Sequence, residues 1–400
     1  MLIQKTLFRT FIVVGLIVPT TVFCQTSFDN YRQKQEKTFQ AYSQKFIHYN
    51  DSLAQDFTKY KKAQQKAYNE YKKELLKYWD NPELTTQKRL VHYTKDKQTK
   101  TAIDFKKKQI QIQTIAKNHK EAKRKLAHAL LKAVTMDTKQ LYKEDELLQK
   151  LDHIKTQSGM LKESIDAKPI LSNVLFKKPP TIKDLIEYTK KEISKNPIKA
   201  QYNSRKKHIY TLNIKLPDDT TIKRSRIYYN EVYKAAKREK ISPALIFAVM
   251  HTESCFNPYA RSYIPAYGLM QIVPRTAGVD AYYYLYKEKR LLTGNYLYNS
   301  YNNIRLGSAY LHILYYKYLK GIKDPLSRLY CTIAAYNTGA GNVARAFGNN
   351  NVKYAAKKIN VMSPNAVYHH LKINLHYKEA RDYLQKVENR RKLYLEIYGS

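Results

Sequence analysis

The sequence predicts an α+β fold that is mostly helical, and three observations lead to this prediction. Aromatic residues recur at helical spacing near the N-terminus, short runs in the middle alternate between apolar and polar residues, and the last third holds strongly apolar helical segments. We therefore expect a long amphipathic helix over residues 25–79, a small mixed α/β domain over 80–225 and a helical domain over 226–400.

Residues 1–24 have the pattern of a secretory signal peptide. Lys5 and Arg9 precede the apolar run FIVVGLIV, and Pro19 ends it. The run is shorter than the roughly 20 residues that a membrane-spanning helix needs, so we expect an exported, periplasmic protein. Cys24 follows a bulky phenylalanine, whereas a bacterial lipidation site has a small residue before its cysteine. Two alternatives stay open: lipid attachment at Cys24, which would anchor the protein in the outer membrane, or simple cleavage.

The segment after the signal peptide carries residue pairs whose members are three residues apart, and the pairs recur in steps of 7 and 11 residues. Seven residues make about two helical turns and eleven about three, so the pairs form one stripe on a straight helix. No Pro or Gly interrupts the helix before Asn81 and Pro82, which should end it. The stripe is a packing seam, against this chain or a second copy, or part of a spacer that keeps the rest away from a membrane. The two uses are compatible. The pairs are Phe28/Tyr31, Phe39/Tyr42, Phe46/Tyr49, Phe57/Tyr60, Tyr68/Tyr71 and Leu75/Tyr78.

Short alternating runs in the middle of the chain predict strands. The runs are RLVHYT, KTAIDF, QIQIQTI and, near 208–216, HIYTLNIKL. Helices are expected around 120–135 and 138–155, and KKPPTIKDL indicates a linker or turn. No catalytic constellation occurs in this region, so we expect it to have a structural or binding role.

Charge and cysteine content restrict the partners. The chain has 72 Lys and Arg against 33 Asp and Glu, a net charge of +39. This favours an acidic partner, although a lysine-rich composition bias would produce the same excess. No nucleic-acid-binding motif accompanies the charge, so we do not expect nucleic acid as a partner. Cys255 and Cys331 could pair in an oxidising compartment, but two free buried thiols are the favoured hypothesis, and no Cys/His grouping has metal-ligand spacing.

The segment SPALIFAVMHTESCFNP predicts a buried helix with an acid at its end. Ser242 and Pro243 are typical of a helix start, and Pro258 requires the helix to end by Asn257. Glu253 therefore lies in the last turn, where burial and the negative end of the helix dipole both raise a carboxyl pKa. A carboxyl that stays protonated near neutral pH can act as a general acid. The alternative is a glutamate that only hydrogen-bonds a nearby loop.

Three motifs follow in a fixed order: E-S-x-F-x-P from Glu253, G-L-M-Q-I from Gly268 and A-A-Y-N ending at Asn337. Together they resemble the lytic transglycosylases of the goose-lysozyme-like SLT superfamily. The longer layout, including EARDYLQKV near the C-terminus, resembles the membrane-bound lytic murein transglycosylase C family. The similarity is strong over 226–395 and looser over 60–220. It implies that the helical domain is lysozyme-like. The chain departs from the family at its lipidation motif, in DAYYYLYKEKRLLTGNY and at the alanine of EA in EARDYLQKV.

The resemblance implies a role for each matching residue. Glu253 corresponds to the single catalytic acid and base, and Gln271 would be available to hydrogen-bond a saccharide. Tyr336 would place its hydroxyl near the acid, and Glu379 and Tyr383 would close the substrate groove. The full set implied for substrate binding is Ser254, Ser262, Gly268, Leu269, Met270, Gln271, Tyr336, Asn337, Glu379 and Tyr383. For Leu269 and Met270, ordinary core packing is the alternative.

The resemblance also implies a reaction on peptidoglycan glycan strands that needs no metal and no cofactor. Most glycosidases use two carboxyl groups, whereas this family uses one. The acid would protonate the oxygen between N-acetylmuramic acid and N-acetylglucosamine. Its ionised form would then take the C6 hydroxyl proton, and a 1,6-anhydro sugar would form without water. Two alternatives remain: a hydrolytic lysozyme-type muramidase and a non-catalytic peptidoglycan-binding scaffold.

Overall fold

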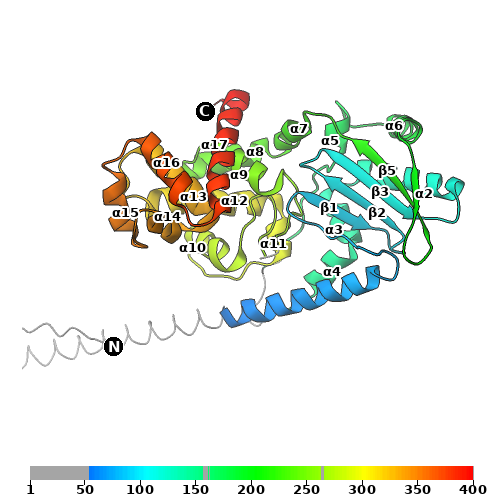
Figure 1. Ribbon diagram of the computed structural model, residues 1–400, viewed down its shortest axis with the longest axis horizontal. Helices are drawn as coiled ribbons and strands as arrows, with labels where there is room; N and C mark the ends of the chain where they lie inside the picture. The colour runs from blue at the N-terminus through cyan, green and yellow to red at the C-terminus, as the bar shows by residue number, and fades with distance from the viewer. Residues whose placement is uncertain (1–53, 156–160, 162, 263–264, 400) are drawn as a thin grey trace, which may run out of the picture. The chain divides into compact units, whose positions relative to one another are not determined.

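The computed structural model describes residues 54–155, 161, 163–262 and 265–399, and the residues from Gln55 onward form one compact unit. The predicted signal peptide, Cys24 and the first half of the aromatic stripe lie outside the described residues. The fold is α+β and mostly helical, as predicted, with one antiparallel sheet followed by a helical region (Figure 1).

The sheet has five strands in the order β1-β2-β3-β5-β4, and every neighbouring pair is antiparallel. The four strands expected from the sequence are confirmed. The fifth, β4, escaped prediction because its residues KAQY are all exposed and show no apolar alternation. The strands are β1 Arg89–Tyr93, β2 Thr99–Asp104, β3 Gln109–Ile115, β4 Lys199–Tyr202 and β5 His208–Lys215.

The two faces of the sheet are covered by different helices, because alternate residues of a strand point to opposite sides. On one face lie α2 (His119–Thr135) and, packed against α2, α6 (Ile182–Lys195). On the other face Tyr71, Leu75 and Trp79, in and just after the helix over 54–75, pack against apolar residues of β1 and β2. The sheet therefore has an apolar layer on both sides.

The helix expected over 138–155 is two helices, α3 (Thr138–Glu144) and α4 (Glu146–Asp152). Asp145 separates them because its backbone is extended there and its carboxyl accepts a hydrogen bond from Leu148 N at 3.0 Å, which caps α4. The short α5 (Ser172–Leu175) precedes α6.

The helical region is built around α9, whose sides are apolar nearly all round. It packs along α17, where Phe247 lies 5.4 Å from the ring of Tyr394 and 4.7 Å from that of Tyr398, between centroids. The helices are α7 Thr220–Ile227, α8 Tyr229–Glu239, α9 Pro243–Ser254, α10 Val279–Tyr286, α11 Gly294–Tyr298, α12 Ser300–His312, α13 Pro325–Thr338, α14 Ala340–Ala346, α15 Val352–Ile359, α16 Pro364–Asn374 and α17 Lys378–Tyr398, with π-helical turns η1 Pro274–Gly278 and η2 Ile313–Tyr318.

The described part of the aromatic stripe is a packing seam within this chain. The hydroxyl of Tyr267 donates to Gln64 Oε1 at 2.7 Å, and Gly294 N donates to the Tyr60 hydroxyl at 3.2 Å. The guanidinium of Arg261 lies 3.5 Å from the centroid of the Tyr68 ring. The spacer hypothesis stays a prediction, because packing against this chain is compatible with it.

The helix of the stripe ends at residue 75, earlier than predicted. A turn follows, in which the amides of Tyr78 and Trp79 both donate to the Leu75 carbonyl at 2.9 Å, and the Trp79 indole donates to Lys97 O at 2.7 Å. The indole hydrogen bond therefore joins the segment after the helix to the turn between β1 and β2.

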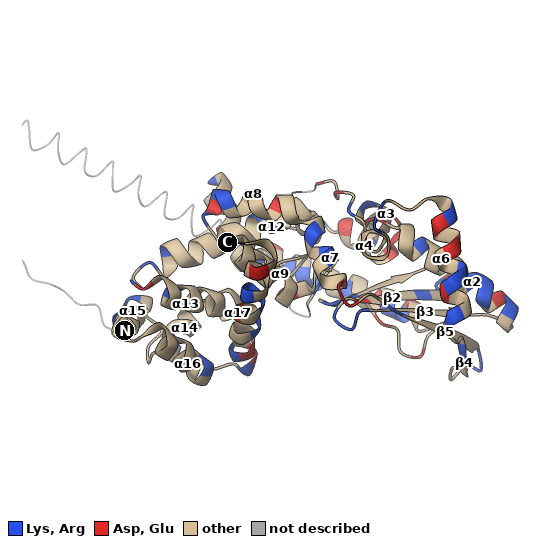
Figure 2. Cartoon of the chain, turned by 90° about the horizontal axis from the view of Figure 1, so that it is seen from above, with Lys and Arg blue, Asp and Glu red and all other residues tan. Residues whose placement is uncertain are grey.

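Two further expectations concern cysteines and membrane spans. Cys255 and Cys331 are both free and buried, which confirms the favoured hypothesis. In the described part of the chain, no helix combines the length and the apolar character that crossing a bilayer requires. Basic side chains are spread over both the sheet region and the helical region (Figure 2).

Two neighbouring leucines test whether the helix over 54–75 belongs to the common core. Leu75 is fully buried, whereas Leu76 is 37% exposed. We expect Leu75→Ala to lower the free energy of unfolding by about 2–5 kcal/mol, because it leaves a cavity between helix and sheet. Leu76→Ala is the matched control and should cost less than about 1 kcal/mol. Urea denaturation followed by circular dichroism measures both, and equal midpoints for the two variants would contradict the shared core.

Candidate active site

A strained turn ends α9 and fixes the position of Glu253. Cys255 and Phe256 both have left-handed backbones, with φ of 50° and 61°, which non-glycine residues rarely adopt. The turn is held from two sides. Asn257 Nδ2 donates to the carbonyls of residues 86 and 87 at 3.1 and 3.3 Å, and buried Arg224 donates twice to the Phe256 carbonyl. Glu253 is thus in the last helical turn, as predicted.

Glu253 is half-buried as a residue, and the surroundings of its carboxyl oppose ionisation. Burial is the main reason that the pKa of Glu253 rises to about 7. The hydroxyl of Tyr383 and the ammonium of Lys88 lower this pKa in part, and the negative charge of Glu379 raises it. A large fraction of the protein therefore carries a protonated Glu253 at neutral pH, which fits the general acid expected from the sequence.

Two tyrosines lie beside this carboxyl. Tyr336, on α13, donates its hydroxyl proton to the Met270 carbonyl at 2.9 Å. Tyr383, on α17, has its hydroxyl near Glu253, and this buried hydroxyl has no hydrogen-bond partner of good geometry among the described residues. Burial, followed by the charge of Glu253, raises the pKa of both phenols well above the usual value, so both remain protonated donors.

The loop from Gly268 is clamped by a buried asparagine. Asn303, on α12, accepts a hydrogen bond from Met270 N at 2.8 Å and donates to the carbonyls of Tyr267 and Leu297 at 2.9 and 2.7 Å. Gly268 has φ of +73°, and a Cβ there would lie only 2.4 Å from Asn303 Nδ2. Glycine is therefore required at this position. Sequence reasoning missed Asn303, because nothing local marks a polar residue of NNIRLGSAYL as buried.

Ser254 and Leu269 connect the end of α9 to this loop. Ser254 is fully buried, and its hydroxyl lies 2.9 Å from Met250 O and 2.8 Å from Leu269 O while it accepts from Phe256 N. The side chain of Leu269 is buried in the core. Both side chains are buried, so they pack and brace the protein around the end of α9.

Met270 and Gln271 also face the protein interior for the most part. A Cβ on Gly307 would lie 2.3 Å from Met270 Sδ, which shows how closely α12 packs against this methionine. Gln271 Nε2 donates to the carbonyls of Ala260 and Gly268 at 3.0 and 3.1 Å, whereas its Oε1 has no partner among the described residues. Oε1 is the acceptor of this side chain without a partner, but it is buried, so its contact with a saccharide stays a prediction.

The remaining predicted substrate residues lie nearer the surface. Ser262 is half-buried, and its hydroxyl accepts from Ala266 N at 3.1 Å. Asn337 is half-buried next to Tyr336, and Glu379 is exposed in the first turn of α17. The substrate-binding roles of all these residues stay predictions.

The small domain adds a basic residue that the sequence did not single out. Lys88, just before β1, is close enough to Glu253 for the two charges to influence each other's pKa. Within the described ranges, no three His, Cys, Asp or Glu side chains converge as a metal site.

Two substitutions should shift the pKa of Glu253 in opposite directions. Tyr383→Phe removes a hydroxyl that favours the carboxylate, so the pKa should rise above about 7. Glu379→Gln removes a like charge, so the pKa should fall. Carbon-13 NMR titration of labelled glutamate carboxyls measures both, with Glu253→Gln used to assign the signal. Shifts in the same direction would contradict this account of the site.

Comparison with protein families gives two adjacent matches. A model of the transglycosylase SLT domain matches residues 231–359. A model of the N-terminal domain of membrane-bound lytic murein transglycosylase C matches residues 54–152. The first match contains α9 and the loop from Gly268, and the second contains Lys88.

Curated relatives extend the similarity over most of the chain. Membrane-bound lytic murein transglycosylase C of Haemophilus ducreyi is 33% identical over 330 residues, which cover 80% of this chain and 83% of the relative. The protein of that name from Klebsiella pneumoniae is 33% identical over 324 residues, covering 78% and 83%. The X-ray structure of lytic transglycosylase Slt from Pseudomonas aeruginosa aligns with 44% of this chain and 27% of its own at 22% identity, with a TM-score of 0.34. On the strength of the first two relatives, the chain belongs to the membrane-bound lytic murein transglycosylase C family.

Proposed function

We propose that this protein is a peptidoglycan lytic transglycosylase that cleaves the β-1,4 bond between N-acetylmuramic acid and N-acetylglucosamine and leaves 1,6-anhydro ends. The observation that carries the proposal is a single carboxyl, Glu253, whose pKa is raised to about 7 by burial beside two tyrosine hydroxyls. Family membership supports the same reaction class. The enzyme would act in remodelling and turnover of the cell wall.

In the first step, protonated Glu253 gives its proton to the glycosidic oxygen, and the bond to C1 of the muramic acid breaks. The acetamido oxygen of the substrate stabilises the sugar cation that forms. Glu253 is now ionised, and the Tyr383 hydroxyl beside it favours this form. In the second step the carboxylate takes the C6 hydroxyl proton as that oxygen bonds to C1, so Glu253 ends protonated and ready for another cycle.

The protein groups around Glu253 suit this sequence. Tyr336 holds the Met270 carbonyl, and Ser254 ties the end of α9 to the carbonyl of Leu269, so the acid and the loop from Gly268 keep a fixed relation. Gln271 Oε1 is a buried acceptor without a partner among the described residues, and its contact with a sugar hydroxyl is part of the proposal. These contacts support the substrate groove proposed from the resemblance, which also includes Ser262, Asn337 and Glu379.

The cellular setting is part of the proposal. Relatives are named membrane-bound, and the N-terminal sequence has a signal-peptide pattern, so we place this protein in the periplasm. Attachment to the outer membrane through a lipid on Cys24 is the finer form of this proposal. We also propose that the chain is divided as the sequence predicts, into a signal peptide, a long helix, a small α/β domain and a catalytic domain that begins at residue 226.

The decisive experiment pairs a substitution with product analysis. Glu253→Gln should abolish digestion of purified sacculi while binding to sacculi persists, because the amide can neither give nor take the proton. Glu396→Gln is the control, since Glu396 is an exposed glutamate on α17. Mass spectrometry of wild-type products should show muropeptides lighter than hydrolytic ones by one water. Products with only reducing ends would indicate a hydrolytic muramidase, and full activity of Glu253→Gln would remove this residue from its role.

A further inference from the structure

Two basic side chains from distant parts of the sequence lie near the end of α9: Arg390 hydrogen-bonds Thr252, the residue before Glu253, and the charge of Lys88 influences Glu253. Lys88 comes from the segment before β1, and Arg390 comes from α17. Both are half-buried and keep some access to solvent. Neither is one of the residues that the resemblance implied for the site.

The backbone around Lys88 is fixed by its neighbours. The Asn257 amide donates to the carbonyls of the two preceding residues, Thr86 and Gln87, and Phe105 N donates to the carbonyl of Lys88 at 3.0 Å. The backbone of the small domain next to Lys88 therefore lies against the turn that follows Glu253.

Arg390 is oriented from the other side. Its Nη1 donates to Thr252 Oγ1 at 2.8 Å, one residue before Glu253. This contact uses one of the five N–H donors of the guanidinium, which leaves the others for a further partner.

These cations have no carboxylate partner among the described residues, although they are held close to other positive charges. Burial is the first cause that lowers the pKa of Lys88, and the charges of Arg390 and Lys106 lower it further. The thiol of Cys255 and the Glu253 carboxyl would favour the charged lysine when ionised, but burial raises the pKa of both, so both are protonated for much of the neutral range. Bringing like charges together at a half-buried site costs free energy unless an anion joins them.

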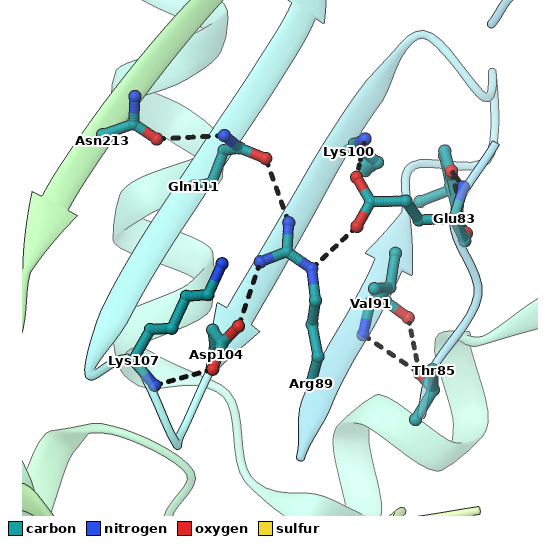
Figure 3. Close-up of polar contacts among 10 residues, drawn as sticks. Glu83, Thr85, Arg89, Val91, Lys100, Asp104, Lys107, Gln111 and Asn213 are labelled. Carbon is teal, nitrogen blue, oxygen red and sulfur yellow. Dashed lines mark hydrogen bonds and ion pairs between the residues drawn. The ribbon is translucent and has the colours of Figure 1, made fainter. Parts of the chain in front are cut away.

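Arg89, the residue after Lys88, is a basic side chain in the same region that does have carboxylate partners. Arg89 donates to Glu83 at 2.7 Å and to Gln111 at 3.0 Å, and it lies 3.6 Å from Asp104 (Figure 3). Glu83 also binds Lys100 at 2.7 Å. The carboxylates of this part of the small domain are therefore already engaged, and Lys88 is left without one.

We propose that Lys88 and Arg390 form a binding site for a carboxylate of the peptidoglycan substrate, next to the cleaved bond. The inference rests on the proposed function and deepens it, because it assigns the small domain a share in substrate recognition. Glycan strands offer carboxylates from two sources, the stem peptides and, where peptides have been removed, the lactyl group of muramic acid. A guanidinium and an ammonium together suit a carboxylate, the first by paired N–H donors and the second by charge.

The test measures binding in the Glu253→Gln background, where no substrate is cleaved and the influence of Lys88 on the Glu253 pKa is removed. The probes for calorimetry are glycan oligomers with stem peptides, the same oligomers stripped by an amidase, and neutral chitohexaose. We expect Lys88→Gln to weaken binding of a carboxylate-bearing probe by about 10-fold or more and to flatten its salt dependence. Chitohexaose binding should change by less than about twofold, and Lys88→Arg should restore most of the loss, because it keeps the charge.

The controls separate this inference from the proposed function. Lys199→Gln, in the exposed strand β4, makes the same charge change away from Glu253 and should leave binding intact. Weakening with peptide-bearing oligomers alone identifies a stem-peptide carboxylate, and weakening that extends to stripped oligomers identifies the lactyl carboxylate. Equal losses for chitohexaose, or no loss for any acidic probe, would overturn the carboxylate site. Neither result would bear on the cleavage chemistry, which the loss of activity in Glu253→Gln tests separately.

Discussion

The site depends on one constraint: Glu253 stands at the last turn of a helix that is buried on nearly every side. A carboxylate taken out of water must be paired or must take up a proton. Here the surrounding charges compensate burial only in part, so the pKa rises to about 7. The same burial opposes folding with an ionised Glu253. Protonation therefore favours the folded form, and this contribution is lost as the pH rises from 4.5 through about 7.

Elements from the whole described chain contribute to that burial. The turn after Glu253 is held by Asn257, which bonds to the small domain, and by Arg224, which also donates to the carbonyl of Ile170. Tyr383 approaches from the C-terminal helix. The small domain thus takes part in the surroundings of Glu253. Even the stripe at the N-terminal end of the described chain supports this unit, since its tyrosines pack against the catalytic region.

Much of this fold could be predicted from the sequence because periodicity reports burial directly. The apolar α9 with Glu253 near its end and four of the five strands follow from local patterns. The break at Asp145 could not be foreseen, since one capping side chain decides it. The site divides in the same way. Sequence motifs located Glu253 and the Gly268 loop. The roles of Lys88 and Asn303 depend on contacts with residues far away in the sequence, so no local pattern marks either residue.

The pH dependence of kcat/KM on purified sacculi tests the central claim most directly, namely that Glu253 works as an acid whose pKa is raised to about 7. The account predicts a descending limb with a midpoint near pH 7, falling about tenfold per pH unit above it, because the ionised form cannot protonate the glycosidic oxygen. Circular dichroism over the same range would show that the protein stays folded. A rate that holds constant to pH 9 would contradict the claim.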